Sequence, residues 1–193
     1  MPSPLSSRRR FLRAAATAAA APLTPAGTPP PAAARTRDDD RWTGDWPHPL
    51  RSAVLRAMPA AVEYARASAR WRFGAVLVDA ATGAVTAGAG NTTESGDPTA
   101  HAEVNLLRSA SAAGLHLPSH VLVSTAEPCP MCAGAALWGG VRAVAYGTSI
   151  AKLIAVGMPQ IDVPLTEVVR RSRLPRPALG RDVRPELTDP LYR

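Results

Sequence analysis

The sequence has 193 residues, which is enough for one domain with a hydrophobic core of ordinary size. Its formal net charge is +7, but the basic side chains gather near the two ends, and residues 35–169 carry 11 basic and 12 acidic side chains. The central part is therefore nearly neutral, which argues against a large surface that follows nucleic-acid phosphates.

Residues 1–34 resemble a twin-arginine export signal. Three arginines (Arg8, Arg9 and Arg10) precede Phe11, and residues 14–23 form a short apolar stretch. This stretch is shorter than the roughly 20 residues that cross a bilayer, and the alanines at 32–34 suit a cleavage site. We predict a signal peptide, export to the periplasm or beyond, and a processed chain that does not span the membrane. A disordered leader with chance arginines is the alternative.

The remaining chain reads as alternating elements. Residues 35–49, rich in proline and charge, predict a linker. Apolar residues at helical or strand spacing predict helices at 50–69, 102–113, 131–138, 149–156 and 165–171, and strands at 73–79, 84–89, 121–124, 141–146 and 160–163. The order predicts an α/β domain over 50–174, with a mixed five-stranded sheet covered by helices on both faces. Residues 175–193 are predicted to be an extended tail.

Two short stretches contain residue types that hold metal ions. They are HAE at 101–103 and PCPMC at 128–132. We expect each to begin a helix, where the helix N-terminus lowers the pKa of a thiol. One imidazole (His101) and two thiolates (Cys129 and Cys132) would make an open tetrahedral zinc site with a position left for water. Glu103, close to His101 in sequence, is then placed to transfer protons. A thiol redox pair, Cys129 and Cys132, is the alternative.

These two stretches resemble the motifs of the zinc-dependent cytidine/deoxycytidylate-type deaminase superfamily, H-x-E followed by P-C-x-x-C. The similarity runs from about residue 73 to residue 146. It implies a three-layer α/β/α fold of the cytidine deaminase type, one Zn²⁺ per subunit and assembly as a homodimer. It also implies hydrolytic removal of an exocyclic amino group, with Glu103 as the catalytic residue.

Within that superfamily, three stretches are similar to bacterial guanine deaminases. They are NTT at 91–93, DPTAH at 97–101 and FGAV at 73–76. The resemblance implies that Asn91 hydrogen-bonds the base. It also implies that Phe73 forms a wall of the pocket, and an aromatic face stacks well on a purine.

Three further residues are candidate substrate contacts by the same resemblance. Trp138 stands where guanine deaminases carry tryptophan and tRNA adenosine deaminases carry histidine, Ala102 lies inside the HAE motif, and Tyr192 lies in a C-terminal segment like one that closes the guanine deaminase site. Residues 147–152 differ from that branch, because they lack its acidic residues.

The sequence thus predicts a zinc hydrolase that deaminates a nucleobase or nucleoside, a purine such as guanine, and releases ammonia. The expected partner is a small molecule rather than a nucleic acid. A tRNA adenosine deaminase is the alternative within the superfamily, although the neutral central charge and Trp138 argue against it. A CxxC thiol redox protein is the alternative of another class, and it would leave His101 and Glu103 without a role.

Overall fold

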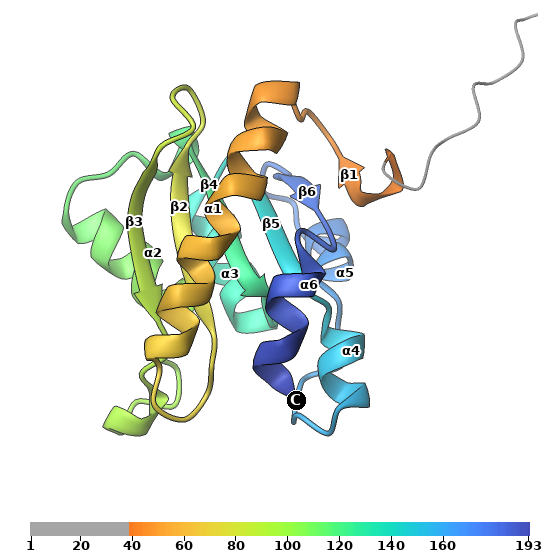
Figure 1. Ribbon diagram of the computed structural model, residues 1–193. Helices are drawn as coiled ribbons and strands as arrows, with labels where there is room; N and C mark the ends of the chain where they lie inside the picture. Colours follow the sequence, from red (N-terminus) through yellow and green to blue (C-terminus); the bar gives the residue numbers. More distant parts are fainter. Residues whose placement is uncertain (1–38) are drawn as a thin grey trace, which may run out of the picture. The chain divides into compact units, whose positions relative to one another are not determined.

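The computed structural model describes residues 39–193 (Figure 1). The export signal predicted over residues 1–34 lies outside the described residues. Within residues 39–193, no helix combines the length and the apolar character needed to cross a bilayer.

A mixed six-stranded sheet forms the centre of this unit, in the order β1-β6-β5-β4-β2-β3. The neighbours β4–β5 and β5–β6 are parallel and the other pairs are antiparallel. The strands are β1 (Trp42–Thr43), β2 (Gly74–Asp79), β3 (Val85–Gly90), β4 (His120–Ala126), β5 (Ala143–Thr148) and β6 (Ala178–Gly180). The sheet is thus of the mixed type that the order of elements predicted.

Helices cover both faces of the sheet (Figure 1). The α-helices are α1 (His48–Ala67), α2 (Ala102–Ala112), α3 (Pro130–Gly139), α4 (Ile150–Ala155), α5 (Leu165–Arg171) and α6 (Pro185–Thr188). Short 3₁₀ turns are η1 (Asp39–Arg41), η2 (Thr93–Ser95), η3 (Leu117–Ser119) and η4 (Asp189–Tyr192). Helix α1 packs on one face, and α2, α3 and α5 pack on the other.

Side chains that alternate along each central strand supply the two halves of the core, as the period of a β-strand requires. In β2, Leu77 packs toward α2 and α3, while Val76 and Val78 pack toward α1. In β4, Leu122 and Val123 divide in the same way. Because both faces are covered, β4 and β5 are buried along their whole length. This rigid pair carries the loops described next.

Three predictions about the periphery are wrong. Residues 160–163 do not form a strand but lie in an irregular loop after α4. The predicted linker contains β1 and the start of α1, and the predicted extended tail contains β6, α6 and η4. The sheet therefore has six strands instead of five. Strands this short form through pairing: β6 lies parallel to β5, and the ring of Trp42 in β1 covers Gly180 so closely that a Cβ there would meet it at 2.5 Å.

Candidate active site

Two helix starts bring together His101, Cys129 and Cys132. His101 is the N-cap residue of α2, Cys129 is the N-cap residue of α3, and Pro130 begins α3, a position that suits proline because its missing N–H has no partner there anyway. The Nδ1 atom of His101 lies 3.7 Å from Sγ of Cys129 and 3.6 Å from Sγ of Cys132. The ligand atoms of all three residues lie within 4.8 Å of one another.

These separations fit a tetrahedral zinc site. Zinc bonds of about 2.0–2.3 Å at tetrahedral angles place a nitrogen and a sulfur ligand roughly 3.5 Å apart. Both sulfurs lie beside the imidazole of His101, which a thiol redox pair would leave without a role, and both cysteines are free thiols. The metal site is therefore favoured over the thiol redox pair.

The charges in the site also fit a divalent cation. The hydrogen bond with Cys132 lowers the pKa of Cys129 to about 4, with a further contribution from His101. The same contact with Cys129, together with burial, raises the pKa of Cys132 above its usual range. Burial likewise raises the pKa of Glu103. Two thiolates and a carboxylate would repel one another if all three were ionised in this buried site. A bound cation offsets that repulsion.

Glu103 lies in the first turn of α2 and is 4% exposed. Its Oε1 atom accepts a hydrogen bond of 2.9 Å from the Oγ atom of Ser124 in β4. Sequence reasoning did not single out Ser124. A signal was present, because Ser124 and Thr125 are hydroxyl residues that follow the apolar residues 121–123 in a buried strand, where polar groups need partners.

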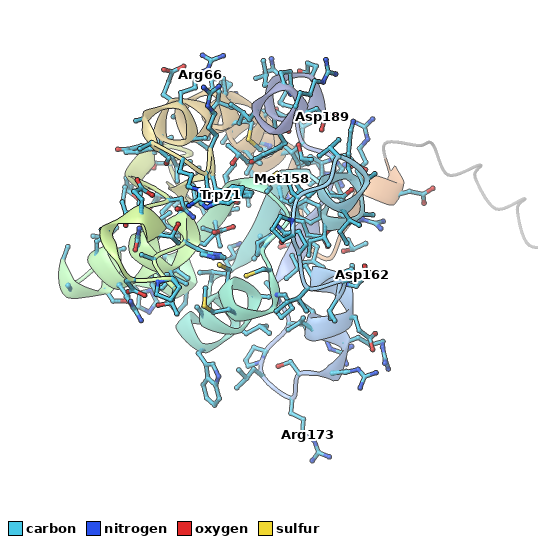
Figure 2. The ribbon with its side chains drawn as sticks, turned by 90° about the horizontal axis from the view of Figure 1, so that it is seen from below. Arg66, Trp71, Met158, Asp162, Arg173 and Asp189 are labelled. Atoms are coloured by element: carbon cyan, nitrogen blue, oxygen red, sulfur yellow. The ribbon has the colours of Figure 1, made fainter. Side chains whose placement is uncertain are left out.

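A pocket of about 630 Å³ opens beside two of the three ligands, His101 and Cys129. The candidate substrate contacts Phe73 and Asn91 also line it. The other lining residues come from the segment before β2, the loop before α2 and the loop after α4: Arg70, Trp71, Thr93, Glu94, Pro98, Met158, Pro159, Gln160 and Ile161. Neither the loop after α4 nor Trp71, which precedes β2, was expected from the sequence to line the pocket. Figure 2 views the molecule from this end, with Trp71 and Met158 labelled.

Asn91 presents a hydrogen-bond donor to this pocket. Its side chain is 3% exposed, and its Oδ1 atom accepts hydrogen bonds from the backbone N–H (3.0 Å) and the hydroxyl (2.8 Å) of Thr93. These bonds fix which way the amide is turned. No group among residues 39–193 accepts a hydrogen bond from the Nδ2 atom, so this N–H₂ group is free to donate to a ligand.

Three predicted substrate contacts do not line the pocket of this chain. Trp138 is 81% exposed and lines a separate groove between α3 and α5. It follows Cys132 by six residues, which turns it roughly 120° around the helix axis from Cys132. Ala102 is fully buried and packs in the core beneath α2.

Tyr192, the third, packs behind the pocket wall. Its ring lies 5.1 Å from that of Phe73, measured between centroids, and its hydroxyl donates a hydrogen bond of 2.8 Å to Oγ1 of Thr125. It is 7% exposed, so it supports Phe73 from behind rather than covering the opening.

Comparison with known proteins agrees with this site. Residues 50–148 match the family described as the cytidine and deoxycytidylate deaminase zinc-binding region. The chain is 43% identical over 96 residues to guanine deaminase of Bacillus subtilis, covering 48% of this chain and 60% of that protein. It is 40% identical over 86 residues to tRNA-specific adenosine deaminase of Haemophilus influenzae, covering 44% of this chain and 50% of that protein. The matches thus span less than two thirds of either relative.

Solved structures show the same fold. A chain from a study of A-to-I editing by tRNA:A34 deaminases superposes with a TM-score of 0.57 at 30% identity, covering 70% of this chain and 98% of that one. Guanine deaminase from Nitrosomonas europaea superposes with a TM-score of 0.59 at 23% identity, covering 77% of this chain and 92% of that one. With its family motif, its fold and its His–Cys–Cys zinc site in agreement, this chain belongs to the cytidine and deoxycytidylate deaminase zinc-binding family.

Proposed function

We propose that this protein hydrolyses the amino group from a purine ring, free or in a nucleoside, with guanine the leading candidate. The observation that carries the proposal is the pocket itself. It places an aromatic wall (Phe73) and a fixed amide donor (Asn91) beside the zinc ligands. An aromatic face stacks on a planar base, and a single well-placed donor reads an acceptor on its edge.

The residues divide the work of the reaction among them. His101, Cys129 and Cys132 hold the zinc ion. Bound zinc supplies water that is activated as a nucleophile near neutral pH. Glu103 takes a proton from the attacking water and gives a proton to the departing amino nitrogen, which leaves as ammonia while the ring carbon gains oxygen. Ser124 holds the Glu103 carboxylate in place for both transfers.

The test is a panel of guanine, adenine, cytosine and their nucleosides, with ammonia release measured on the zinc-loaded protein. We expect the purines to be deaminated. The variant Glu103→Gln should keep its zinc and lose about 10²–10⁴-fold in rate, the usual contribution of a general acid–base group. The matched control Glu63→Gln, an exposed carboxylate on α1, should keep full activity. Full activity in Glu103→Gln would refute the assigned role.

A tRNA adenosine deaminase is the second candidate. It is supported by the structural relative from the tRNA:A34 deaminase study, which is matched at 30% identity over 98% of its length. The discriminating experiment compares inosine formation in an anticodon stem-loop with deamination of free guanine by the same preparation. A higher kcat/KM on the stem-loop would favour this second candidate.

We also propose that the protein is exported, on the strength of the twin-arginine pattern in residues 1–34. Fusing these residues to a folded reporter should send it out of the cytoplasm, and replacing Arg9 and Arg10 by lysine in the fusion should retain it. A reporter that stays inside with the intact segment would contradict the proposal.

A further inference from the structure

A second hollow, which we call the arginine groove, adjoins the substrate pocket. It has a volume of about 390 Å³, and its walls include Arg70, Trp71, Arg72, Met158 and Arg193. Three of these residues, Arg70, Trp71 and Met158, also line the substrate pocket. Trp71 and Met158, which line both hollows, are labelled near each other in Figure 2. The two hollows are therefore neighbours, and a ligand that fills one lies next to the other.

The arginine groove is positively charged, and its charge is not balanced by acidic side chains of the described residues. Within residues 39–193, no Asp or Glu lines it, and none of its three arginines forms an ion pair with a carboxylate. Other exposed arginines do form an ion pair with a carboxylate, as Arg66 does with Glu63. Arg70 and Arg72 by themselves make the groove cationic. Unpaired guanidinium groups beside a binding pocket are suited to an anionic part of a ligand.

The arrangement around Trp71 narrows the kind of anion. The guanidinium of Arg70 lies over the Trp71 ring, 5.1 Å from its centroid, which limits the positions that the guanidinium occupies. Guanidinium groups bind phosphate through paired N–H donors, and an indole ring offers a flat surface to a base or sugar. An aromatic surface flanked by two arginines therefore fits a phosphorylated sugar better than a lone inorganic ion.

We propose that the arginine groove binds the phosphate of a purine nucleotide whose base lies in the zinc pocket. This inference rests on the proposed function, because it places a purine beside the zinc ligands. A free base would leave the groove empty, whereas a nucleotide would fill both hollows. The phosphate belongs to a mononucleotide or to a nucleotide within a short single strand, and the two share this chemistry.

The test measures binding by calorimetry to the zinc-loaded full chain carrying Glu103→Gln, so that no turnover occurs. The probes are guanosine and guanosine 5′-monophosphate, adenosine and adenosine 5′-monophosphate, and a trinucleotide of each base. In at least one base series we expect the monophosphate to bind at least 10-fold more tightly than the nucleoside. The double variant Arg70→Gln/Arg72→Gln should reduce that ratio to about threefold or less. The readout is this ratio rather than the affinity for the nucleoside, because Arg70 also lines the substrate pocket. Both arginines are exposed, so the variant should fold, and Arg193→Gln provides a second variant.

The matched control is Arg56→Gln, an exposed arginine of α1 that lines neither hollow. It should keep the full ratio. Equal affinity for nucleoside and monophosphate in both base series, or a ratio that survives in the double variant, overturns the proposal. If the trinucleotide binds more tightly than the monophosphate, and loses affinity more steeply as salt is added, the phosphate in the groove belongs to a nucleotide within a single strand. If the nucleotide binds but the parent protein does not deaminate it, the groove is still a phosphate site and the proposed reaction is rejected.

Discussion

At the scale of single residues, Asn91 offers a clean test of substrate recognition. Its Oδ1 atom is held by Thr93, so only the Nδ2 group faces the pocket. The variant Asn91→Asp keeps the acceptor for Thr93 and removes the donor. We expect kcat/KM for the proposed purine substrate to fall by about 10–100-fold, because a missing hydrogen bond to a buried ligand costs about 1–3 kcal/mol. Zinc content and thermal stability should stay close to the parent values, and steady-state kinetics measures the change.

Glu127 has a structural role, although it does not line the pocket. Its buried carboxylate accepts hydrogen bonds from the backbone N–H groups of Ile150 (2.9 Å) and Leu165 (2.8 Å). It therefore fixes the starts of α4 and α5, and with them the loop between the two helices that forms one side of the pocket.

Replacing Glu127 by alanine should destabilise the fold by about 2–5 kcal/mol, because two buried N–H groups lose their partner. Urea unfolding of the zinc-loaded protein measures this. Glu127→Gln, which keeps one acceptor oxygen, should cost less. The exposed Glu63→Ala serves as the control and should change stability by less than about 1 kcal/mol. A neutral Glu127→Ala would show that the two helix starts do not depend on this carboxylate.

At the scale of elements, the C-terminal segment α6–η4 is the support of the pocket wall. The hydroxyl of Thr148 at the end of β5 lies 2.9 Å from that of Thr188 and donates to Oδ1 of Asp189 at 2.8 Å, and Lys152 forms an ion pair with the same carboxylate. Tyr192 then reaches Phe73. The segment lies beyond the part of the chain that matches the family, yet it holds a pocket residue in place.

Gly147 allows this contact to be disturbed without touching the pocket. A Cβ atom at this position would meet the side chain of Thr188 at 2.4–2.8 Å, and Thr188 is fully buried. We expect Gly147→Ala to displace α6–η4, to lower stability by about 1–3 kcal/mol and to raise KM with zinc content unchanged. Gly134→Ala is the matched control, since a Cβ there meets nothing within 4 Å and alanine suits a helix. An unchanged KM in Gly147→Ala would show that the segment does not support the wall.

At the scale of the whole molecule, zinc joins the starts of α2 and α3 across the edge of the sheet. Removing it should therefore loosen the fold as well as stop the reaction. A metal at 100–1,000 times its dissociation constant stabilises the folded state by about 3–4 kcal/mol, and about 3 °C per kcal/mol is usual for a domain of this size. We expect a chelator to lower Tm by roughly 10 °C.

Added zinc should restore that loss, and scanning calorimetry measures both steps. The difference between zinc-loaded and zinc-free protein should shrink as pH falls, because protons compete with zinc for the thiolates and the imidazole. The variant Cys132→Ser, which replaces one sulfur, should show a much smaller response to the chelator. A Tm that ignores the chelator in the parent protein would contradict a structural contribution from the metal.

The sequence by itself determined the features that depend on local patterns. Helix α5 has the predicted bounds, and α2 and the strands of the β2–β3 hairpin differ from them by one residue at the ends, because apolar periodicity and helix-start residues act over a few neighbours. The ligand set His101, Cys129 and Cys132 was equally readable, since the family motif and thiolate chemistry identify it. Phe73 and Asn91, which the resemblance to guanine deaminases named as candidates, line the pocket beside that site.

Only the tertiary structure decided the features that depend on distant neighbours. The strands β1 and β6 are too short to show a period, and they exist because Trp42 and Gly180 pair at the sheet edge. Tyr192 contacts Phe73, which lies 119 positions earlier in the sequence. Trp138 lies on the exposed side of α3, away from the pocket. The meeting of Arg70, Arg72 and Arg193 depends in the same way on how loops and the C-terminal segment pack against one another. Such contacts have no local pattern, because the free energy that forms them comes from packing rather than from the residues on either side.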